Sequence, residues 1–418
     1  MHQKIWLMNH YAADMFRDKA GRHYWFARKL KEKGYDPTVF CANTYHNKLS
    51  GIPINNGKYT VKKDNNIPYV FVKTHMSQGN GLGRIRNMFG FYFNLFPTAK
   101  KIVKADGKPD VIIASSVHPL TMVAGIQIAR KLKVPCICEI RDLWPEAIFS
   151  FGKAKETSLL GKILIAGEHW IYRHADALIF TKEGDTDYLK ERGWTTEQGG
   201  DIELEKCYYI NNGVNIEAFQ NSIKVDILDD AELENEKFHV VYAGILRPVN
   251  DVGKILDCAK ILKEEKDIQF LIYGDGNQFD MLRERVRNES IDNVRMKGFV
   301  DRKYIPYVLN HSSVNILNYS QSKYNWSRGN SSNKLFEYMA SGKPVISTVK
   351  MGYDIIDKYH CGISLEKDSA AYLADAVLRI KQMDKAEYEN LCEAAKNAAE
   401  HFDFSVLTER LIHVIESV

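Results

Sequence analysis

The sequence lacks the marks of several large classes of protein. It has no run of 18 or more apolar residues, so a membrane-spanning helix is not expected. Its seven cysteines are an odd number spread along 418 residues, which argues against a disulfide scaffold. The opening stretch from Met1 to Asp14 has neither the apolar core nor the small-residue cleavage site of a signal peptide. We therefore expect a cytoplasmic protein.

Patterns that bind a metal or hold a phosphate in a loop are missing too. The thirteen histidines show no paired metal-ligand spacing. Cys136 and Cys138 are two apart in an apolar strand, so their side chains point to opposite faces and cannot easily hold one ion. The glycine-rich run Gly79–Gly83 lacks the Lys-Ser/Thr ending of a phosphate-binding loop. No metal and no cofactor is expected.

The composition that remains is that of a globular protein of about two domains. Hydrophobic residues make up 45% of the chain and charged residues 26%, and 418 residues exceed one ordinary core. Residues 1–210 carry 31 Lys and Arg against 21 Asp and Glu, a net +10, whereas the remainder carries 26 against 32, a net −6. The basic half could face a membrane surface or a phosphorylated substrate. Nucleic acid is the least expected partner, because no nucleic-acid-binding motif accompanies the charge.

Short β-branched or aromatic runs alternate with longer segments of helical periodicity along the whole chain. The expected strands are Ile5–Asn9, Thr38–Ala42, Tyr69–Lys73, Val111–Ser115, Cys136–Ile140, Ala177–Thr181, Cys207–Ile210, His239–Ala243, Gln269–Tyr273, Asn293–Lys297, Val314–Leu317, Pro344–Thr348 and Gly362–Leu365. This alternation, which restarts near residue 238, predicts an α/β fold of two facing Rossmann-like, doubly wound domains. We expect an N-terminal domain over 1–222, a C-terminal domain over 223–400, and a helix over 401–418 that returns to the first domain.

The most informative segment is Ser331–Pro344. A polar N-cap at Ser332 or Asn333 predicts a helix of about nine residues that leads into a strand. Lys334 stands in the first turn, where an acid is preferred, so an external anion could compensate its charge. Glu337, one turn further, could accept two hydrogen bonds from sugar hydroxyls. The alternative is a capped helix on which both charges are merely solvated.

A family resemblance rests on this segment and on others in the same order. The run Asn333–Ile346 resembles the donor-binding motif of the retaining glycosyltransferases of family four, which have the two-domain GT-B fold. The other matching segments are Gly21–His23, Asp110–Pro119, Glu139–Glu146, Asn212–Asn215, Tyr242–Gly244, Gly274–Gly276 and Gly298–Val300. The resemblance spans nearly the whole chain and is closest to members that build capsular polysaccharide or O-antigen.

The resemblance implies transfer of a sugar, with retention and without a metal, from a nucleotide-sugar that we expect to be UDP-linked. The transferred group would be a hexosyl or N-acetylhexosaminyl group, and the acceptor a lipid-linked or free saccharide in cell-surface polysaccharide synthesis. Glu337 would hold the ribose, and Phe299 and Val300 would meet the base through their backbone. The full set of donor-binding residues implied is Gly244, Gly274, Gly276, Phe299, Val300, Ser332, Asn333, Leu335 and Glu337.

The sequence departs from the family pattern at two places. Most members carry two glutamates eight positions apart, but the earlier position here is Gly329. Most also carry an Arg and a Lys after the glycine turn of the second domain, where this chain has Ile245 and Asn250 and the nearby cation is Arg247. We therefore expect Arg247 and Lys334 together to hold the diphosphate. A solvated turn residue is the alternative for Arg247.

The first domain is expected to supply a catalytic histidine and the acceptor side. His118 follows an apolar strand, and the resemblance implies that it faces the donor sugar; a structural histidine is the alternative. The charged loop Glu139–Glu146 is expected to line the acceptor side, with a salt-bridged structural loop as the alternative. The acceptor-side residues implied are Gly21, Arg22, His23, Glu139, Arg141 and Asp142.

Residues 81–108 interleave six basic residues with large apolar ones and contain a single acid, Asp106. Such a segment suits the interface of an anionic membrane, so we expect a peripheral attachment to the inner face of the plasma membrane. Packing of the aromatic residues beneath the sheet is the alternative.

Two rival functions also stay open, a sugar-nucleotide epimerase of similar fold and a nucleotide-sugar-binding protein without catalysis. The residue at Gly329 favours the second of these rivals.

Overall fold

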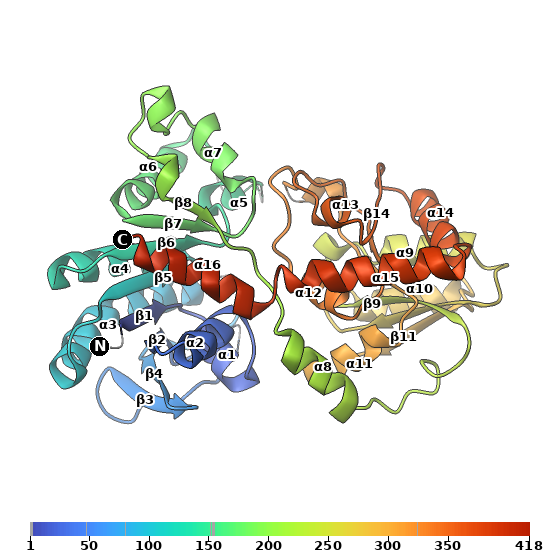
Figure 1. Ribbon diagram of the computed structural model, residues 1–418, viewed down its shortest axis with the longest axis horizontal. Helices are drawn as coiled ribbons and strands as arrows, with labels where there is room; N and C mark the ends of the chain where they lie inside the picture. Colours follow the sequence, from blue (N-terminus) through green and yellow to red (C-terminus); the bar gives the residue numbers. More distant parts are fainter. Residues whose placement is uncertain (1–2, 47, 80, 151, 153–154, 324) are drawn as a thin grey trace. The chain divides into compact units, whose positions relative to one another are not determined.

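The computed structural model describes residues 3–418 except 47, 80, 151, 153–154 and 324 (Figure 1). By its internal contacts the chain divides into two compact units, Met1–Asn211 with Leu407–Val418, and Asn212–Val406. The expected boundary at residue 222 thus falls inside helix α8 (Ile216–Val225), which packs on helices of the second unit. The C-terminal return starts at Leu407 instead of 401, because Val214 of the second unit pairs with Phe402 and Phe404 through backbone hydrogen bonds.

The first unit is built on an eight-stranded sheet of order β3-β4-β2-β1-β5-β6-β7-β8. Strands β3 and β4 pair antiparallel, and the other neighbours pair parallel. The strands are β1 (Lys4–Met8), β2 (Asp36–Ala42), β3 (Tyr59–Asp64), β4 (Ile67–Val72), β5 (Val111–Ser115), β6 (Cys136–Ile140), β7 (Ala177–Phe180) and β8 (Cys207–Tyr209). The central strands β1, β5, β6 and β7 are mostly apolar and almost entirely buried, as is typical of strands covered on both faces.

The helices of the first unit are α1 (Ala12–Asp18), α2 (Arg22–Glu32), α3 (Leu82–Asp106), α4 (Pro119–Leu132), α5 (Trp144–Ser150), α6 (Leu159–His174), α7 (Asp185–Glu191), the short 3₁₀ helices η1 (Thr196–Gln198) and η2 (Leu204–Lys206), and most of α16 (Phe404–Glu416). The end of α16 is tied to this unit by hydrogen bonds from Tyr35 Oη to Glu416 and from Tyr208 Oη to Ser417, both of 3.1 Å. None of the helices in the described part of the chain is both long and apolar enough to cross a membrane.

The second unit is built on a six-stranded parallel sheet of order β11-β10-β9-β12-β13-β14. Its strands are β9 (Phe238–Ala243), β10 (Ile268–Tyr273), β11 (Val294–Gly298), β12 (Val314–Leu317), β13 (Val345–Ser347) and β14 (Gly362–Ser364). Its helices are α8, α9 (Gly253–Ile261), α10 (Phe279–Asn288), α11 (Ile305–Asn310), α12 (Asn333–Ala340), α13 (Ile355–Tyr359), α14 (Ala370–Lys381) and α15 (Lys385–Glu400), with the 3₁₀ helices η3 (Pro248–Asn250), η4 (Arg302–Tyr304) and η5 (Gln321–Lys323).

Alternate residues along the strands of the second unit enter two separate apolar cores. Val241 and Leu271 pack in the core that contains α12 and α15, whereas Val240 and Phe270 pack in the core that contains α9 and α14. This period of two is what a strand buried on both faces produces. The expected fold class, two doubly wound α/β units, is confirmed.

Every expected strand is present, and one further strand, β3, is not among those expected. Its sequence, YTVKKD, exposes Val61, Lys62 and Lys63 at the edge of the sheet. An edge strand needs no apolar face on both sides and is commonly protected by lysines, so it has no apolar pattern to recognise.

Each sheet has one place where the strand order reverses. In the first sheet the reversal lies between the neighbours β1 and β5, and in the second between β9 and β12. Loops leave such a point in opposite directions, which opens a crevice at the carboxyl ends of the strands where doubly wound proteins bind ligands. The residues that follow these four strands are therefore the first place to look for a functional site.

Candidate functional site

Lys334 lies at the reversal point of the second sheet, in the first turn of α12. Its Nζ is 4.5 Å from the centre of the Tyr319 ring and 4.8 Å from that of Tyr242, and 3.3 Å from Tyr242 Oη. A Cβ atom on Gly244, directly after β9, would lie 3.2 Å from the same Nζ. The glycine thus leaves room for the ammonium group, which two aromatic faces hold by cation–π attraction.

The charge of Lys334 has no acidic partner among the described residues. Burial, with a smaller contribution from the positive charge of Arg247, lowers the pKa of Lys334 to about 7. Arg247, the residue before η3, is exposed, and it likewise makes no ion pair with a described carboxylate. Two cations directed to one place without an acid form a site for an anion.

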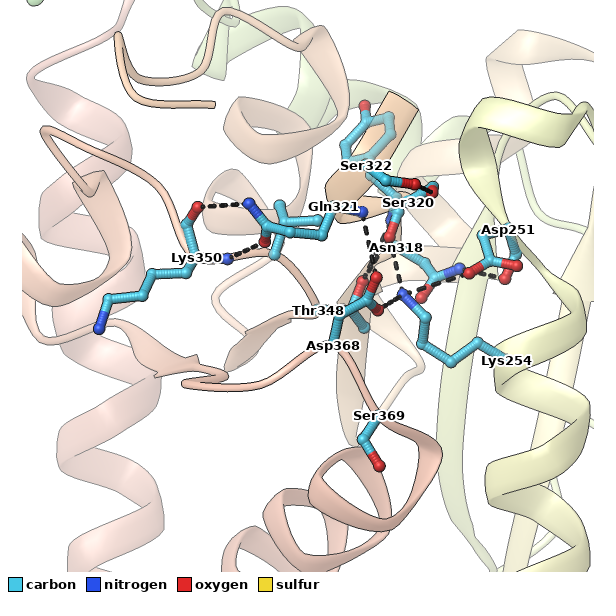
Figure 2. A network of polar contacts seen from close by, with 12 residues as sticks. Asp251, Lys254, Asn318, Ser320, Gln321, Ser322, Thr348, Lys350, Asp368 and Ser369 are labelled. Atoms are coloured by element: carbon cyan, nitrogen blue, oxygen red, sulfur yellow. Dashed lines mark hydrogen bonds and ion pairs between the residues drawn. The ribbon is translucent and has the colours of Figure 1, made fainter. Parts of the chain in front are cut away.

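Tyr319 is held in place by its backbone. Its carbonyl accepts hydrogen bonds from Lys254 Nζ at 2.8 Å and from Thr348 Oγ1 at 3.2 Å, and its N–H donates to Thr348 Oγ1 at 3.1 Å. Lys254 is buried and forms ion pairs with Asp368 and, at 3.4 Å, with Asp251. Figure 2 shows this network.

The same network joins the loops that follow β12 and β13. Asn318 Nδ2 donates to the carbonyls of Asn250 and Asp251 at 2.6 and 2.8 Å, and the Gln321 side chain bridges to the backbone of Lys350 (Figure 2). Buried charges that are paired and hydrogen-bonded in this way fix one arrangement of the loops. These contacts within the second unit therefore fix the position of the Tyr319 ring beside Lys334.

The start of α12 leaves its first amide groups available. Ser332 is the N-cap, but its hydroxyl lies 2.6 Å from Tyr319 Oη and makes no capping hydrogen bond. Asn333 is exposed as the first helical residue. The side chain of Leu335 is fully buried in the core, so only its backbone could meet a ligand. Free amides at a helix N-terminus add to the attraction for an anion.

Gly274 and Gly276 follow β10 and are needed for a close approach of two loops. A Cβ atom on Gly274 would overlap the carbonyl oxygen of Gly244, and one on Gly276 would overlap that of Leu246. The loops are joined by hydrogen bonds of 2.9 Å from Gly244 N to the carbonyl of Tyr273 and from Leu246 N to that of Asp275. The glycines thus support the turn that carries Gly244.

Glu337 lies one turn beyond Asn333 and accepts a hydrogen bond of 3.0 Å from Arg302 of η4. The pair is partly exposed, so it is weak enough to be exchanged for a ligand. Phe299, after β11, is 73% exposed, whereas Val300 is partly buried against the α12 core. Val300 therefore lies on the side of the sheet that α12 covers, and Arg302 is a contact of Glu337 that the sequence did not predict.

Gly329, the position where the family usually has a glutamate, has φ +96°. A residue with a Cβ atom is strained in this region of backbone space. The loop before α12 thus adopts a conformation that a glutamate could not take without cost.

His118 in the first unit is fully buried and belongs to a chain of three side chains at the reversal point between β1 and β5. His118 Nε2 lies 2.7 Å from His10 Nδ1, and His10 Nε2 lies 2.5 Å from Asn87 Oδ1. Asn87 Nδ2 donates to Thr44, to Thr74 and to the carbonyl of His75, which can only accept.

The direction of these hydrogen bonds follows from the carbonyl of His75. Asn87 must turn its amide nitrogen to that carbonyl, so its oxygen accepts from His10 Nε2. His10 Nδ1 then accepts from His118 Nε2, which leaves His118 Nδ1 as a buried acceptor without a partner among the described residues. Burial lowers the pKa of His10 to about 3 and that of His118 well below its usual range. Both rings are neutral at pH 7.

Three of the expected acceptor-side residues form a buried ion-pair cluster. Arg22, next to Gly21 at the start of α2, contacts Glu139 Oε2 through Nε at 2.7 Å and donates to the carbonyls of Ile210 and Asn211. His23 Nε2 lies 3.2 Å from Glu139 Oε1. Burial alone would raise the pKa of Glu139, but the charge of Arg22 beside it, with those of His23 and Arg141, holds that pKa well below its usual range.

Arg22, His23 and Glu139 are buried and paired with one another, so they position the ends of β6 and β8. We expect Arg22→Ala to lower the free energy of unfolding by about 3 kcal/mol, because it leaves the Glu139 carboxylate buried without its main partner. Lys29→Ala on the same helix removes the exposed pair with Glu32 and is the matched control, with an expected cost below about 1 kcal/mol. Urea unfolding measures both; equal effects would contradict a structural role for the cluster.

Three acceptor-side residues remain. Gly21 is the partly buried N-cap of α2, and Arg141 and Asp142 are accessible. Arg141 is partly exposed, and its Nε has no hydrogen-bond partner among the described residues. Asp142 is exposed and lines a pocket of about 160 Å³ whose other walls come from α4, α5 and α6. The end of β6 thus presents a cation beside an apolar pocket.

Several residues of these sites give no signal in the sequence. Tyr319 is a buried aromatic residue near a strand end, and Tyr242, although in a matching segment, was expected to have no role of its own. His10 and Asn87 lie far apart in the chain, and Arg302 stands in the short 3₁₀ helix η4. Only the strand order brings them together. The position directly after β9 or β12 is the one clue that the predicted strands supply.

Among the described residues, no three His, Cys, Asp or Glu side chains converge as a metal site.

Two family models match the chain, one for each unit. Residues 22–198 match "Glycosyl transferase 4-like domain", and residues 225–401 match "Glycosyl transferases group 1". A Bacillus subtilis (strain 168) protein named as a teichuronic acid biosynthesis glycosyltransferase, TuaH, is 28% identical over 219 residues. The alignment covers 51% of this chain and 50% of that protein, so the chain spans about half the length of this curated relative.

Solved structures share the fold over the entire chain. HepE from Anabaena, determined in complex with UDP, aligns with a TM-score of 0.66 and 14% identity and covers 100% of both chains. WaaG, a glycosyltransferase involved in lipopolysaccharide biosynthesis, aligns with a TM-score of 0.63 and 14% identity over 98% of this chain and 99% of that one. At such identity the likeness concerns the fold, which is that of GT-B glycosyltransferases.

Proposed function

We propose, from the premise that both halves of this chain match glycosyltransferase domains, that the protein transfers a sugar from a UDP-sugar to a lipid-linked saccharide in cell-surface polysaccharide synthesis. The observation that carries the proposal is Lys334, a cation without an acidic partner among the described residues, held between two tyrosine rings beside Gly244 at the start of α12. A nucleoside diphosphate supplies the missing anion.

In this proposal the second unit binds the donor. Lys334, Arg247 and the first amides of α12 hold the diphosphate, so no metal is required to offset its charge. Glu337 exchanges Arg302 for the ribose hydroxyls. The exposed Phe299 lies where the base is expected. Relatives named for cell-envelope polysaccharides support the acceptor class.

The proposed reaction retains the configuration of the sugar. The acceptor hydroxyl oxygen forms the new bond to the anomeric carbon on the face from which the phosphate leaves. The electron pair of the broken bond goes to the β-phosphate of UDP, which takes the acceptor's proton. His118 orients the transferred sugar, and as a neutral ring with a free Nδ1 it accepts a hydrogen bond from a sugar hydroxyl. No carboxylate nucleophile is needed, unlike in retaining glycosidases.

The direct test is turnover of UDP-sugars with a cell-envelope lipid extract. UDP release that depends on the extract, with a glycosylated lipid as product, supports a transferase. Conversion of the UDP-sugar to its epimer without acceptor would favour the epimerase, and tight UDP-sugar binding without turnover would favour the binding protein. EDTA is expected to leave turnover unchanged; a loss that magnesium or manganese restores would contradict the metal-independent reaction.

The binding of UDP-glucose is expected to weaken as the pH rises above 7. The pKa of Lys334 is about 7 in the free protein and rises when a diphosphate lies beside it. Below pH 7, Lys334 is charged in both the free and the ligand-bound protein, so the affinity is constant. Above pH 7, Lys334 must take up a proton when the ligand binds, and the affinity falls by up to about tenfold per pH unit.

Calorimetry between pH 6 and 8.5 measures this dependence. Lys334→Arg keeps its charge throughout this range and serves as the control, with a flat profile expected if the fold is intact. A flat profile in the wild type as well would contradict the assignment of Lys334 to the diphosphate.

Helix α3 has the surface expected for contact with an anionic membrane. Leu82 is 84% exposed and Phe93 is 62% exposed, and Ile85 and Phe89 between them are also exposed, which makes an apolar stripe at helical spacing. Exposed basic residues accompany the stripe: Arg86, Lys100, Lys101 and Lys104. Phe91 and Leu95 of the same helix are buried in the core, and Tyr92 and Phe96 pack against it, so part of the segment packs beneath the sheet and the exposed stripe is what remains for docking.

We expect wild-type protein to sediment with liposomes that contain anionic lipid at low salt. Changing Arg86, Lys100, Lys101 and Lys104 together to Gln should remove most of the binding, at about 1 kcal/mol per residue. Changing Phe89 and Phe93 together to Ser should remove the binding that persists at higher salt. Changing Lys58, Lys62 and Lys63 on and beside the edge strand β3 to Gln is the control and should change little. Equal losses in both lysine variants would mean that net charge alone drives the contact.

A further inference from the structure

The first unit contains an apolar pocket between α4, α5 and α6 that has no part in holding the donor. Its volume is about 160 Å³. The walls are almost entirely carbon and include Leu120, Met122, Val123, Trp144, Ile163 and Ile171. A space of this kind does not hold water well, because water needs two or more polar partners. It favours an apolar occupant.

The one buried charged group in the wall is satisfied by neighbours on its own side. Glu168 accepts hydrogen bonds from Tyr172 Oη at 2.7 Å through Oε1 and from Tyr188 Oη at 2.6 Å through Oε2. Burial also raises the pKa of Glu168 to about 7, so the carboxyl is partly neutral at that pH. The pocket therefore offers a hydrocarbon ligand little competition from unpaired polar atoms.

Gly167, in the interior of α6, also lines the pocket. A Cβ atom there would meet no other atom within 4 Å, so neither packing nor a close backbone approach requires a glycine. Glycine within a helix costs about 1 kcal/mol relative to alanine. Gly167 is exposed, so the place of its absent side chain is open space beside the pocket wall.

Apolar surface at the start of α6 continues into the pocket, and a cation, Arg141, is the chain neighbour of one wall residue. At the start of α6, Leu159 is 77% exposed and Ile163 is 58% exposed, and Ile163 also forms part of the wall, so apolar surface continues inward. Elsewhere the wall includes Pro119, which follows His118, and Asp142, which follows Arg141. Arg141 has an Nε without a hydrogen-bond partner among the described residues.

We propose that this pocket binds the aliphatic chain of the lipid-linked acceptor, with the phosphate next to that chain paired to Arg141. In this proposal the lipid end of the acceptor binds to the first unit, near the end of β6. This inference rests on the proposed function for its biological meaning, but the binding of a lipid phosphate can be measured without any donor.

Farnesyl diphosphate is a suitable probe, and its binding can be followed by calorimetry in the absence of UDP-sugar. Gly167→Leu places a side chain in the empty space without a clash and should weaken binding at least about tenfold, which is less than the contribution of two buried methylene groups. Ala166→Leu adds the same side chain to the neighbouring exposed position of α6, outside the wall, and should bind as the wild type does.

Further ligands separate the two parts of the site. Arg141→Gln should weaken binding of farnesyl diphosphate but not of farnesol, and inorganic pyrophosphate alone should bind poorly to all variants. Decyl phosphate tests whether the pocket binds an unbranched chain as tightly as an isoprenoid chain. Binding of either ligand that is weaker in Gly167→Leu than in the wild type supports the pocket.

The proposal is overturned if wild-type protein does not bind farnesyl diphosphate or decyl phosphate, or if Gly167→Leu binds both as tightly as the wild type. UDP binding, which belongs to the other unit, should be unchanged in Gly167→Leu. Absence of UDP binding in the wild type would contradict the proposed function, while the effect of Gly167→Leu on lipid phosphate would still decide the pocket.

Discussion

Lys334→Ala is expected to lower kcat/KM for the UDP-sugar by about a thousandfold and to weaken UDP binding. The ammonium is already freed from water and placed between Tyr319 and Tyr242, so it needs no rearrangement to stabilise the charge that develops on the leaving diphosphate. The described residues offer no acid that competes for it. Initial-rate kinetics and calorimetry with UDP measure the two effects.

Arg247→Ala should lose less, about tenfold, because an exposed guanidinium is partly screened by solvent and salt. Lys396→Ala is the control for loss of a lysine in this unit, since Lys396 lies exposed on α15 and pairs with Glu393. Wild-type kinetics in Lys334→Ala would contradict the assignment. A drop of equal size in Lys396→Ala would show that net charge, and not a specific contact, is being measured.

His118→Ala is expected to lower kcat by about a thousandfold and to change UDP affinity by no more than about twofold. The proposed contact of this histidine is with the transferred sugar and not with the nucleotide. Because its pKa lies well below the usual range, the ring is neutral from pH 6 to 8, and kcat of the wild type should show no titration attributable to it.

Glu337→Gln is the converse variant. An amide accepts fewer hydrogen bonds from ribose than a carboxylate, so UDP affinity should fall while kcat at saturating donor changes little. Equal losses of UDP affinity in both variants would contradict this division of roles. If His118 is only structural, His118→Ala will lower the melting temperature without lowering kcat per folded molecule, since a buried ring and its hydrogen bond to His10 are lost.

The backbone conformation at position 329 explains why a glutamate is unfavourable there. At φ +96° a glutamate side chain would require a strained backbone, so Gly329→Glu alone does not restore the family's usual contact. A second local feature is Arg302, which pairs with Glu337 at 3.0 Å. Both lie close in sequence or in space to the expected donor residues, so we infer that they bear on the choice of sugar and not on the type of reaction.

Charge pairing is the part of the candidate site that sequence reasoning could not reach. Arg22 and Glu139 are separated by more than a hundred positions, and nothing local in either segment shows that they neutralise each other. From the sequence they were expected to face the acceptor; the structure buries them against β8. By contrast, Lys334 and Gly244 were expected to be near each other from family motifs, and the structure places the lysine beside the glycine.

Local sequence patterns were enough to predict the alternation of strands and helices, two mainly parallel sheets and the helix that starts after Ser332. These features depend on apolar periodicity and on capping, which act over a few neighbouring residues. The tertiary structure alone decided which strand ends adjoin, and so which side chains share a site: Tyr319 with Lys334, and His10 with His118. The physical reason is that strand order in a sheet is set by packing between segments distant in the chain, and the partner of a charge or a hydrogen bond is chosen only after that order exists.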